Sequence, residues 1–340
     1  MSQATTLCML LIALATEAVP AQHPPTSGNA GARAQATRNT KLIPLAFDDG
    51  PALYALPHVD SHPSVEASSH SDHARFFASL PVGFRTPKAE DEVGTRLLAC
   101  YGAVLVARGG TTPPPVLVFP DEESVARWQS SVKTDRVEIN KTGVELQRPA
   151  LRALMEARLE ARISKLDITP RGADAARRTY TDSVELWMSR VRPGLRHWVK
   201  EGRLDQREAQ RILALALRDQ VREILRLEKQ GLLFSKDFSK SILVSVAPPG
   251  ASEHISMLAL DINENADPAV RAILARHGWF QTVPFDLPHF AYLGVSETEL
   301  TLLGLRAVAI GEREFWIPDL GIPVEKTLEG LDQGRVTRPQ

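Results

Sequence analysis

Residues 248–262 read PPGASEHISMLALDI. A turn-forming Pro-Pro-Gly opens this stretch, His254 follows, and a single carboxylate, Asp261, comes directly after the apolar run of residues 257–260. The apolar run predicts a buried strand over 257–262. Burying a charge is costly unless something pairs with it, so Asp261 needs a cation or an ion-pair partner.

Around this stretch, the pattern of apolar residues predicts both strands and helices. The expected strands cover residues 97–107, 116–119, 242–246, 257–262 and 290–293. The expected helices cover residues 121–129, 149–165, 174–191, 204–229 and 268–277, with the helix over 174–191 ending before Pro193. Helices grouped before strands are typical of an α+β domain, here with a mainly antiparallel sheet and helices packed on one side.

Charge and cysteine content exclude several classes of protein. Among 340 residues, 40 Lys and Arg stand against 41 Asp and Glu, for a net charge of −1. No global field therefore attracts the chain to nucleic acid or anionic lipid, and we expect no nucleic-acid partner. The two cysteines, Cys8 and Cys100, cannot form a disulfide framework.

The N-terminus is typical of an exported protein. Residues 7–15 (LCMLLIALA) form an apolar run too short to span a bilayer, and residues 19–21 (VPA) place small residues where a signal peptidase cuts. We expect a signal peptide over 1–21, a periplasmic or extracellular location, and no stable membrane insertion after cleavage. The alternative is a short hydrophobic tail without this role.

The composition also divides the rest of the chain. Residues 22–90 are rich in Pro, Ser, His, Ala and Gly, which predicts a leader or linker of low order. We expect an N-terminal α/β extension over 91–145 and the main domain over 146–325.

Three side chains in the last third have the chemistry of a zinc site: His254, Asp261 and His289. Imidazole and carboxylate are both zinc ligands, and a catalytic zinc keeps three protein ligands and a water. Seven residues separate His254 from Asp261, which is too far along a continuous strand or helix for one ion. We expect the chain to bend between them, with His254 on a loop, Asp261 on a strand and His289 on a neighbouring strand.

Asp286 lies three residues before His289, and Pro288 favours an extended segment there. A carboxylate beside a metal ion can act as a general base toward water, so Asp286 is a candidate catalytic residue. Arg177 and Arg178, in a predicted helix, are candidates to stabilise negative charge. Ordinary interpretations also exist, because a lone histidine is often structural and an aspartate ending a strand often accepts a hydrogen bond from a turn.

Residues 252–261 (SEHISMLALD) and 286–290 (DLPHF) together resemble the zinc D-alanyl-D-alanine carboxypeptidase and dipeptidase family. That family belongs to the superfamily of the lysostaphin-type peptidases and the hedgehog signalling domain. Its pattern is Ser-x-His-x-x-Gly-x-Ala-x-Asp, then an acidic residue three positions before a histidine in a Trp-His-Phe context. The matching positions are Ser252, His254, Ala259, Asp261, Asp286, His289 and Phe290.

The resemblance, which covers about residues 146–293, implies the family's fold and a zinc ion bound by His254, Asp261 and His289. It implies that Asp286 is the general base and that Ser252 binds substrate or orients the site. The family also has an arginine at the start of a helix, for which Arg178 is favoured over Arg177 in this sequence.

Three positions depart from the family pattern: Met257 replaces the glycine, Asp286 the usual glutamate, and Pro288 the tryptophan. The resemblance nevertheless implies a secreted zinc metallopeptidase, a hydrolase that cleaves short peptides such as peptidoglycan stem peptides near a D-Ala-D-Ala end. Trp279, just before the Asp286 segment, is a further candidate for lining the substrate cleft.

Two other functions remain open. The three departures favour a non-catalytic module of the same fold that binds wall peptides or a protein partner. The helix expected over 204–229 is an alternative partner surface. The sequence leaves the oligomeric state and the choice between carboxypeptidase, dipeptidase and endopeptidase undecided.

Overall fold

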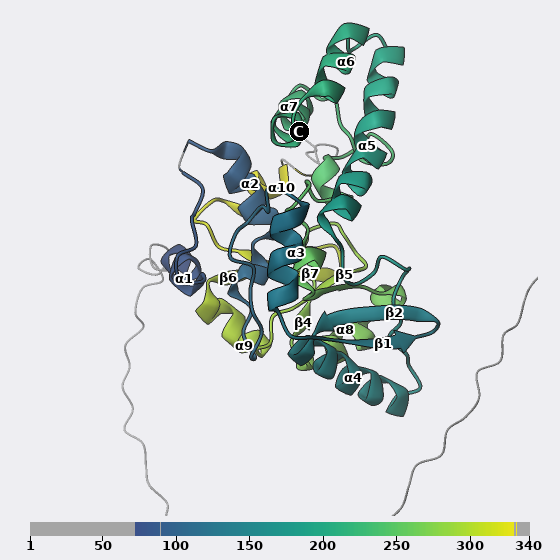
Figure 1. Cartoon of the computed structure of the whole chain (residues 1–340). Coiled ribbons are helices and arrows are strands. Elements are labelled where there is room, and N and C mark those ends of the chain that lie inside the picture. Colours follow the sequence, from purple (N-terminus) through teal and green to yellow (C-terminus); the bar gives the residue numbers. More distant parts are fainter. Residues whose placement is uncertain (1–71, 89, 330, 332–340) are drawn as a thin grey trace, which may run out of the picture. The chain divides into compact units, whose positions relative to one another are not determined.

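The computed structural model describes residues 72–88, 90–329 and 331 (Figure 1). All of these residues belong to one unit that spans residues 62–340. The expected signal peptide, and the expected leader as far as residue 71, lie outside the described residues. Within the described ranges, none of the helices combines the length and the apolar character needed to cross a lipid bilayer.

The described residues form helices and antiparallel strands, which confirms the α+β class. The α-helices are α1 (Asp72–Ser79), α2 (Glu92–Tyr101), α3 (Glu122–Ser131), α4 (Arg148–Ile163), α5 (Tyr180–Lys200), α6 (Gln206–Ala214), α7 (Leu217–Lys229), α8 (Pro268–Arg276), α9 (Glu297–Leu300) and α10 (Val324–Glu329). The strands are β1 (Thr134–Ile139), β2 (Thr142–Gln147), β3 (Ala259–Asp261), β4 (Trp279–Phe280), β5 (His289–Tyr292), β6 (Leu305–Ile310) and β7 (Arg313–Pro318). They pair as β1-β2, β3-β5-β4 and β6-β7, so three small sheets replace the one sheet that we expected.

Several expected strands are wrong. Within 97–107, residues 97–101 lie in α2 and residues 103–106 form a 3₁₀ helix, η1 (Ala103–Val106). Residues 116–119 form no strand, and residues 242–246 contain the 3₁₀ helix η2 (Ile242–Val244). Asp91 starts α2 by accepting a hydrogen bond from Gly94 N at 2.9 Å. The run from Leu97 to Tyr101 is buried throughout, and an apolar run of this kind carries no period that separates a strand from a helix.

The long helices also differ from expectation at their ends. The helices expected over 121–129, 149–165 and 268–277 are confirmed as α3, α4 and α8. The helix α5 begins later than expected, after the capping residue Thr179, and continues through Pro193 to Lys200. Burial of Val191, Leu195 and Trp198 on either side of Pro193 offsets the hydrogen bond that a proline removes from a helix.

The helix expected over 204–229 is two helices, α6 and α7, separated by Leu215 and Ala216 in extended conformation. Gln220 stabilises this break from inside the fold. Its Nε2 donates to Ile212 O at 3.2 Å, and its Oε1 accepts from Trp187 Nε1 at 2.9 Å. A buried side chain thus adds a second hydrogen bond to a carbonyl at the end of α6, which also accepts from Leu215 N at 3.3 Å.

Two clusters of buried residues support these elements. The first, here the sheet core, surrounds β3, β5 and β4 and includes residues of α4 and α8. The second, here the helical core, joins residues of α2, α5, α6, α7 and η2. Figure 1 shows α5, α6 and α7 together as one group of helices.

Residues expected to lie outside the main domain contribute to the sheet core. Phe76 of α1 is fully buried in it, and its backbone lies against Gly304. Residues 72–79, at the end of the expected leader, therefore belong to the fold. Val104 and Val144, from the segment expected to be an N-terminal extension, lie in the same core.

Candidate metal centre

The pairing of β3 with β5 brings two of the predicted ligands together. Asp261 ends β3, His289 begins β5, and the two residues are direct partners in the antiparallel register. His254 reaches the same point from the 3₁₀ helix η3 (Glu253–Ser256). Met257 then takes a left-handed conformation, with φ of 57°, and leads the chain toward β3. The chain thus bends between His254 and Asp261, as we expected.

The loop before η3 is fixed by a close backbone approach. Gly250 has φ of +80°, and a Cβ added there would lie 2.1 Å from Phe119 O. Phe119 N also donates to Gly250 O at 3.0 Å. Only glycine fits such a position, so the Pro-Pro-Gly turn sets where the chain enters η3.

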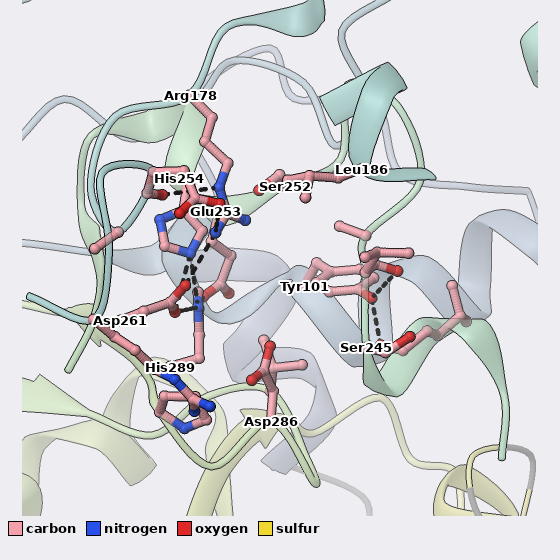
Figure 2. Close-up of a pocket in the computed structure, with 18 of the residues that line it drawn as sticks. Tyr101, Arg178, Leu186, Ser245, Ser252, Glu253, His254, Asp261, Asp286 and His289 are labelled. Carbon is pink, nitrogen blue, oxygen red and sulfur yellow. Dashed lines mark hydrogen bonds and ion pairs between the residues drawn. The ribbon is translucent and has the colours of Figure 1, made fainter. Parts of the chain in front are cut away.

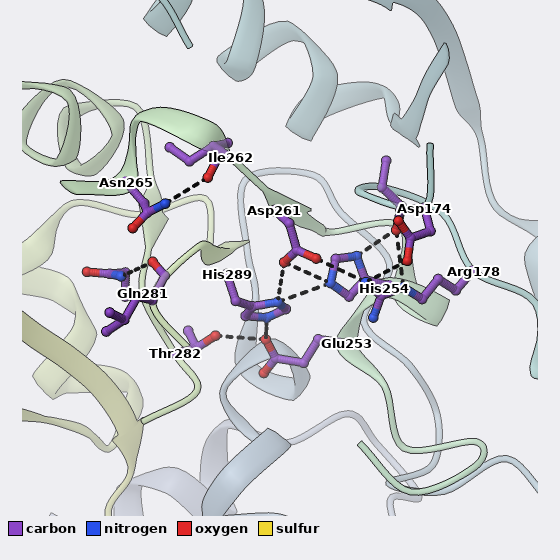
Figure 3. Close-up of polar contacts among 12 residues, drawn as sticks. Asp174, Arg178, Glu253, His254, Asp261, Ile262, Asn265, Gln281, Thr282 and His289 are labelled. Carbon is purple, nitrogen blue, oxygen red and sulfur yellow. Dashed lines mark hydrogen bonds and ion pairs between the residues drawn. The ribbon is translucent and has the colours of Figure 1, made fainter. Parts of the chain in front are cut away.

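The three donor atoms lie at the corners of a nearly equilateral triangle (Figure 3). His254 Nε2 is 3.1 Å from His289 Nδ1 and 3.3 Å from Asp261 Oδ1, and these last two atoms are 3.2 Å apart. Ligand atoms about 2.0–2.1 Å from a tetrahedral ion are about 3.3 Å from one another. These three residues can therefore hold a metal ion, with the fourth corner of the tetrahedron left for another ligand.

Hydrogen bonds on the far side of each ring orient the two histidines. His254 Nδ1 donates to Ala176 O at 2.8 Å, which leaves Nε2 as the free acceptor. His289 Nε2 donates to Glu253 Oε2 at 2.8 Å, which directs Nδ1 toward Asp261 and His254. Thr282 Oγ1 donates to the same oxygen of Glu253 at 2.7 Å. Such partners behind a metal-binding histidine fix its tautomer and its orientation.

Arg178 holds the carboxylate ligand. Its Nη2 donates to Asp261 Oδ2 at 3.0 Å, and its Nε donates to Asp174 O at 3.1 Å. The backbone of Asp261 is fixed as well, because its N donates to Ala175 O and its O accepts from Arg171 N, each at 2.9 Å. Asp261 Oδ1 is thereby turned toward the two histidines.

The charges around His289 favour a cation at this point. Burial alone would lower the pKa of His289, but its hydrogen bonds with Asp261 and Glu253 raise that pKa to about 10. Burial would raise the pKa of Asp261, yet His254 and His289 hold it well below its usual range. Burial also lowers the pKa of His254, and the nearby Arg178 adds to this effect. Two carboxylates thus face one imidazole, an arrangement that a divalent cation would stabilise.

One buried atom beside the site supports the same conclusion. Glu253 is almost fully buried, and its Oε1 has no hydrogen-bond partner among the residues that the structure describes. An acidic side chain in such a place costs free energy unless positive charge lies nearby. The donor set, the tetrahedral spacing and the carboxylate behind His289 all fit a bound metal ion.

The ligands open onto a cavity of about 320 Å³, a size found for small-molecule sites. Ser252 and Asp286 line this cavity together with Arg178 and the three metal-binding residues. Figure 2 shows the carboxyl group of Asp286 near His289 and facing the cavity. Burial raises the pKa of Asp286 to about 6, although the nearby His289 acts in the opposite direction.

Two predicted substrate-binding residues lie elsewhere. Arg177 binds Gln129 Oε1 at 3.0 Å and Glu145 Oε2 at 3.1 Å, and neither Arg177 nor these partners line the cavity. Trp279 is fully buried in the sheet core and packs on Tyr292. The structure therefore assembles the expected ligands with Asp286, Arg178 and Ser252, but without Arg177 or Trp279.

Four residues of the cavity wall or its support were not singled out from the sequence: Glu253, Tyr101, Arg171 and Arg190. Of these, only Glu253 could have been found from the sequence, because it is an acidic residue directly before His254. Tyr101 OH donates to Leu243 O at 2.6 Å, and burial raises its pKa well above the usual value. Tyr101 is therefore a neutral part of the wall.

Comparison of this chain with family models, with curated proteins and with solved structures finds no match. The resemblance to the D-alanyl-D-alanine peptidases thus stays a prediction from the quoted residues.

Proposed function

We propose that this chain is an exported zinc-dependent metallopeptidase that cleaves short cell-wall peptides, in the manner of a D-alanyl-D-alanine carboxypeptidase. The observation that carries the proposal is the triangle of His254, Asp261 and His289, with an open corner on a cavity that Asp286 also lines. The resemblance of residues 252–261 and 286–290 supplies the substrate class, and the apolar run near the N-terminus supports export.

Zinc is the metal that this donor set suits best. Two imidazoles and one carboxylate, with one position left open, make up a common set of protein ligands for catalytic zinc. When bound, zinc would polarise the scissile carbonyl and lower the pKa of a water molecule toward 7.

Asp286 is the proposed general base. Its carboxylate would accept a proton from the attacking water and pass it to the nitrogen of the leaving amine. A pKa raised to about 6 suits this exchange, because the group is mainly ionised at neutral pH but still basic enough to take a proton. Aspartate is one methylene shorter than the family's glutamate, and its partly buried place in the cavity wall is consistent with that role.

Arg178 and Ser252 are the proposed substrate contacts. Arg178 uses Nη2 for Asp261 and Nε for Asp174 O, and its Nη1 would face the negative charge that develops on the carbonyl oxygen. Ser252 lines the same cavity two residues before His254 and would hydrogen-bond the peptide.

The test is an Asp286→Asn variant assayed beside the wild type at equal zinc content. The substrates are muropeptides that end in D-Ala-D-Ala, with mass spectrometry to detect the released D-alanine. We expect the rate to fall by about 100-fold or more, since loss of a general base costs roughly 10²–10⁴-fold. Asp135→Asn is the matched control, because Asp135 pairs with Arg148 on the surface of the β1-β2 hairpin.

An unchanged rate in Asp286→Asn would remove Asp286 from the base role. One zinc per chain without any product, in the wild type, would instead support the non-catalytic peptide-binding module.

A further inference from the structure

The cavity extends beyond the metal centre to a second group of side chains. Its far wall is formed by Leu186 and Arg190 from α5 and by Leu243, Ser245 and Val246 in and after η2. Figure 2 shows Leu186 and Ser245 across the cavity from Asp261 and His289. A ligand that fills this space would therefore touch residues that take no part in the metal site.

Arg190 is the charged residue of that wall. It is partly buried, and its Nε is inaccessible to solvent yet has no hydrogen-bond partner within the described ranges. Its Nη1 donates to Ser189 Oγ at 2.9 Å. No carboxylate of the described residues lies within ion-pair distance of Arg190, in contrast to Arg178, which is held by Asp261.

The carboxylates of the cavity wall have other partners or another proposed role. Asp174 lies 3.8 Å from the guanidinium of Arg178, Glu253 binds His289, and Asp261 belongs to the metal centre. The fourth, Asp286, is the proposed general base beside His289. A partly buried guanidinium with an unpaired Nε and no carboxylate partner favours an anionic ligand, because charge-assisted hydrogen bonds would offset the hydration that Nε has lost.

Arg190 and the metal centre lie on the same cavity. Arg190 follows Tyr180, the first residue of α5, by ten residues, or roughly 15 Å at 1.5 Å per residue. Long side chains on a helix lean toward its N-terminus, which is the end of α5 next to Arg178. Because Arg190 and the metal-binding residues line one cavity, a peptide bound there can contact both.

We propose that Arg190 binds a carboxylate of the substrate on the wall of the cavity across from the metal centre. The ligand's identity as a peptide rests on the proposed peptidase function. The cavity would then select peptides that carry this carboxylate over their neutral counterparts. The carboxylate can come from an acidic side chain or from the C-terminus of the peptide, and both present the same group to a guanidinium.

The experiment uses four short peptides that share a D-Ala-D-Ala sequence. They carry Glu or Gln two residues before the scissile bond, and a free or amidated C-terminus. Their binding to the zinc-loaded full chain is measured by fluorescence anisotropy in an Asp286→Asn background, so that no peptide is consumed. The variants are Arg190→Gln, Arg190→Lys and, as a matched control, Arg192→Gln, which removes the same charge from an exposed position on the same helix.

We expect Arg190→Gln to weaken binding of the acidic peptide by about 10- to 100-fold and binding of its neutral counterpart by less than about 2-fold. Arg190→Lys should restore part of the loss, and Arg192→Gln should change neither peptide by more than about 2-fold. If Arg190→Gln weakens binding of the Glu peptides but not of the Gln peptides, the bound group is a side-chain carboxylate. If it weakens binding of the free-acid peptides but not of the amidated ones, the bound group is the C-terminus.

Equal affinity of the parent protein for all four peptides would overturn the proposal. So would equal losses for acidic and neutral peptides in Arg190→Gln. Cleavage without charge-dependent binding would refute this subsite alone. Charge-dependent binding by a wild type that cleaves none of the peptides would leave the subsite standing and refute the proposed function.

Discussion

Glu253 supports one metal ligand while its neighbour in the chain, His254, supplies another. The carboxylate of Glu253 accepts hydrogen bonds from His289 and from Thr282, at 2.8 and 2.7 Å. A negative charge behind the ring makes the opposite nitrogen a stronger metal ligand. One 3₁₀ turn, η3, therefore determines both the position of His254 and the basicity of His289.

This role predicts the effect of Glu253→Gln, which keeps the shape of the side chain and removes its charge. Zinc affinity should fall by about 10- to 100-fold, as is typical when such a partner is lost. A competition titration with a chromophoric chelator measures it. Glu145→Gln is the control, because Glu145 pairs with Arg177 outside the cavity. Equal zinc affinity in wild type and Glu253→Gln would show that Glu253 does not tune the site.

Among single residues, the sequence predicted the three metal-binding residues better than the residues that hydrogen-bond to them. His254, Asp261 and His289 have distinctive chemistry, and the pairing of β3 with β5 brings the last two together. From the residues alone Arg177 and Arg178 could not be separated, and only the resemblance favoured Arg178. Which of two adjacent residues faces a cavity depends on the path of the backbone between elements. That Glu253 turns toward His289 depends on η3, whose 3₁₀ geometry left no mark in the sequence.

Met257 shows how a residue other than glycine can take a backbone conformation that favours glycine. It replaces the glycine of the pattern, and it adopts a left-handed conformation that glycine takes at little cost. Its side chain is buried, and that burial offsets the roughly 1–2 kcal/mol that such a conformation costs other residues.

Among the helices, α5 shows the clearest conflict between local preference and packing. It contains Pro193 and Gly194, two poor helix formers, and still continues to Lys200. Gly194 is buried against Phe234, and a Cβ added there would lie 2.3 Å from Phe234 Cδ1. The glycine therefore allows the ring of Phe234 to sit against the helix backbone.

This contact predicts that Gly194→Ala destabilises the protein, although alanine is the better helix former by about 1 kcal/mol. Overpacking of a buried site typically costs about 1–3 kcal/mol, so we expect a net loss of up to about 2 kcal/mol in urea unfolding. The double variant with Phe234→Leu, which leaves more room for the new methyl group, should show a smaller loss than the two single changes added together. A gain in stability from Gly194→Ala alone would contradict this account of α5.

Where a helix was expected, its presence was easier to predict than its ends. Periodic apolar residues indicated α3, α4 and α8, but the end of α5 and the break between α6 and α7 depend on buried contacts of Trp198 and Gln220. The β1-β2 and β6-β7 hairpins were missed. Their turns contain Asn140-Lys141 and Gly311-Glu312 rather than the strongest hairpin signals.

Across the described unit, the cavity depends on both cores. Leu243 and Val283 of its wall belong to the helical core, whereas Ala175 belongs to the sheet core. Buried Glu228, on α7, connects the helical core to this wall. It accepts hydrogen bonds of 2.6 Å from both Ser241 Oγ and Ile242 N, at the start of η2. Burial nevertheless raises the pKa of Glu228 to about 7.

This shift predicts how stability depends on pH. Because the folded pKa of Glu228 lies above the unfolded value of 4.5, its contribution is fully present below about pH 4.5 and is lost as the pH rises to about 7. Relative to Glu228→Gln, the wild type should lose on the order of 3 kcal/mol across this range, at about 1.4 kcal/mol per pKa unit.

Urea unfolding of both proteins between pH 4.5 and 8 tests this difference, with Glu185→Gln as a control at an exposed glutamate on α5. A constant difference in stability between wild type and Glu228→Gln across the pH range would show that Glu228 keeps an ordinary pKa in the fold.

The most direct test of the metal centre is X-ray absorption at the zinc edge on the zinc-loaded chain. The account predicts one zinc per chain with nitrogen and oxygen ligands at about 2.0–2.1 Å, two of them imidazoles, and loss of one imidazole in His289→Ala. Failure of the wild type to retain zinc, or a spectrum of His254→Ala or His289→Ala identical to that of the wild type, would contradict it.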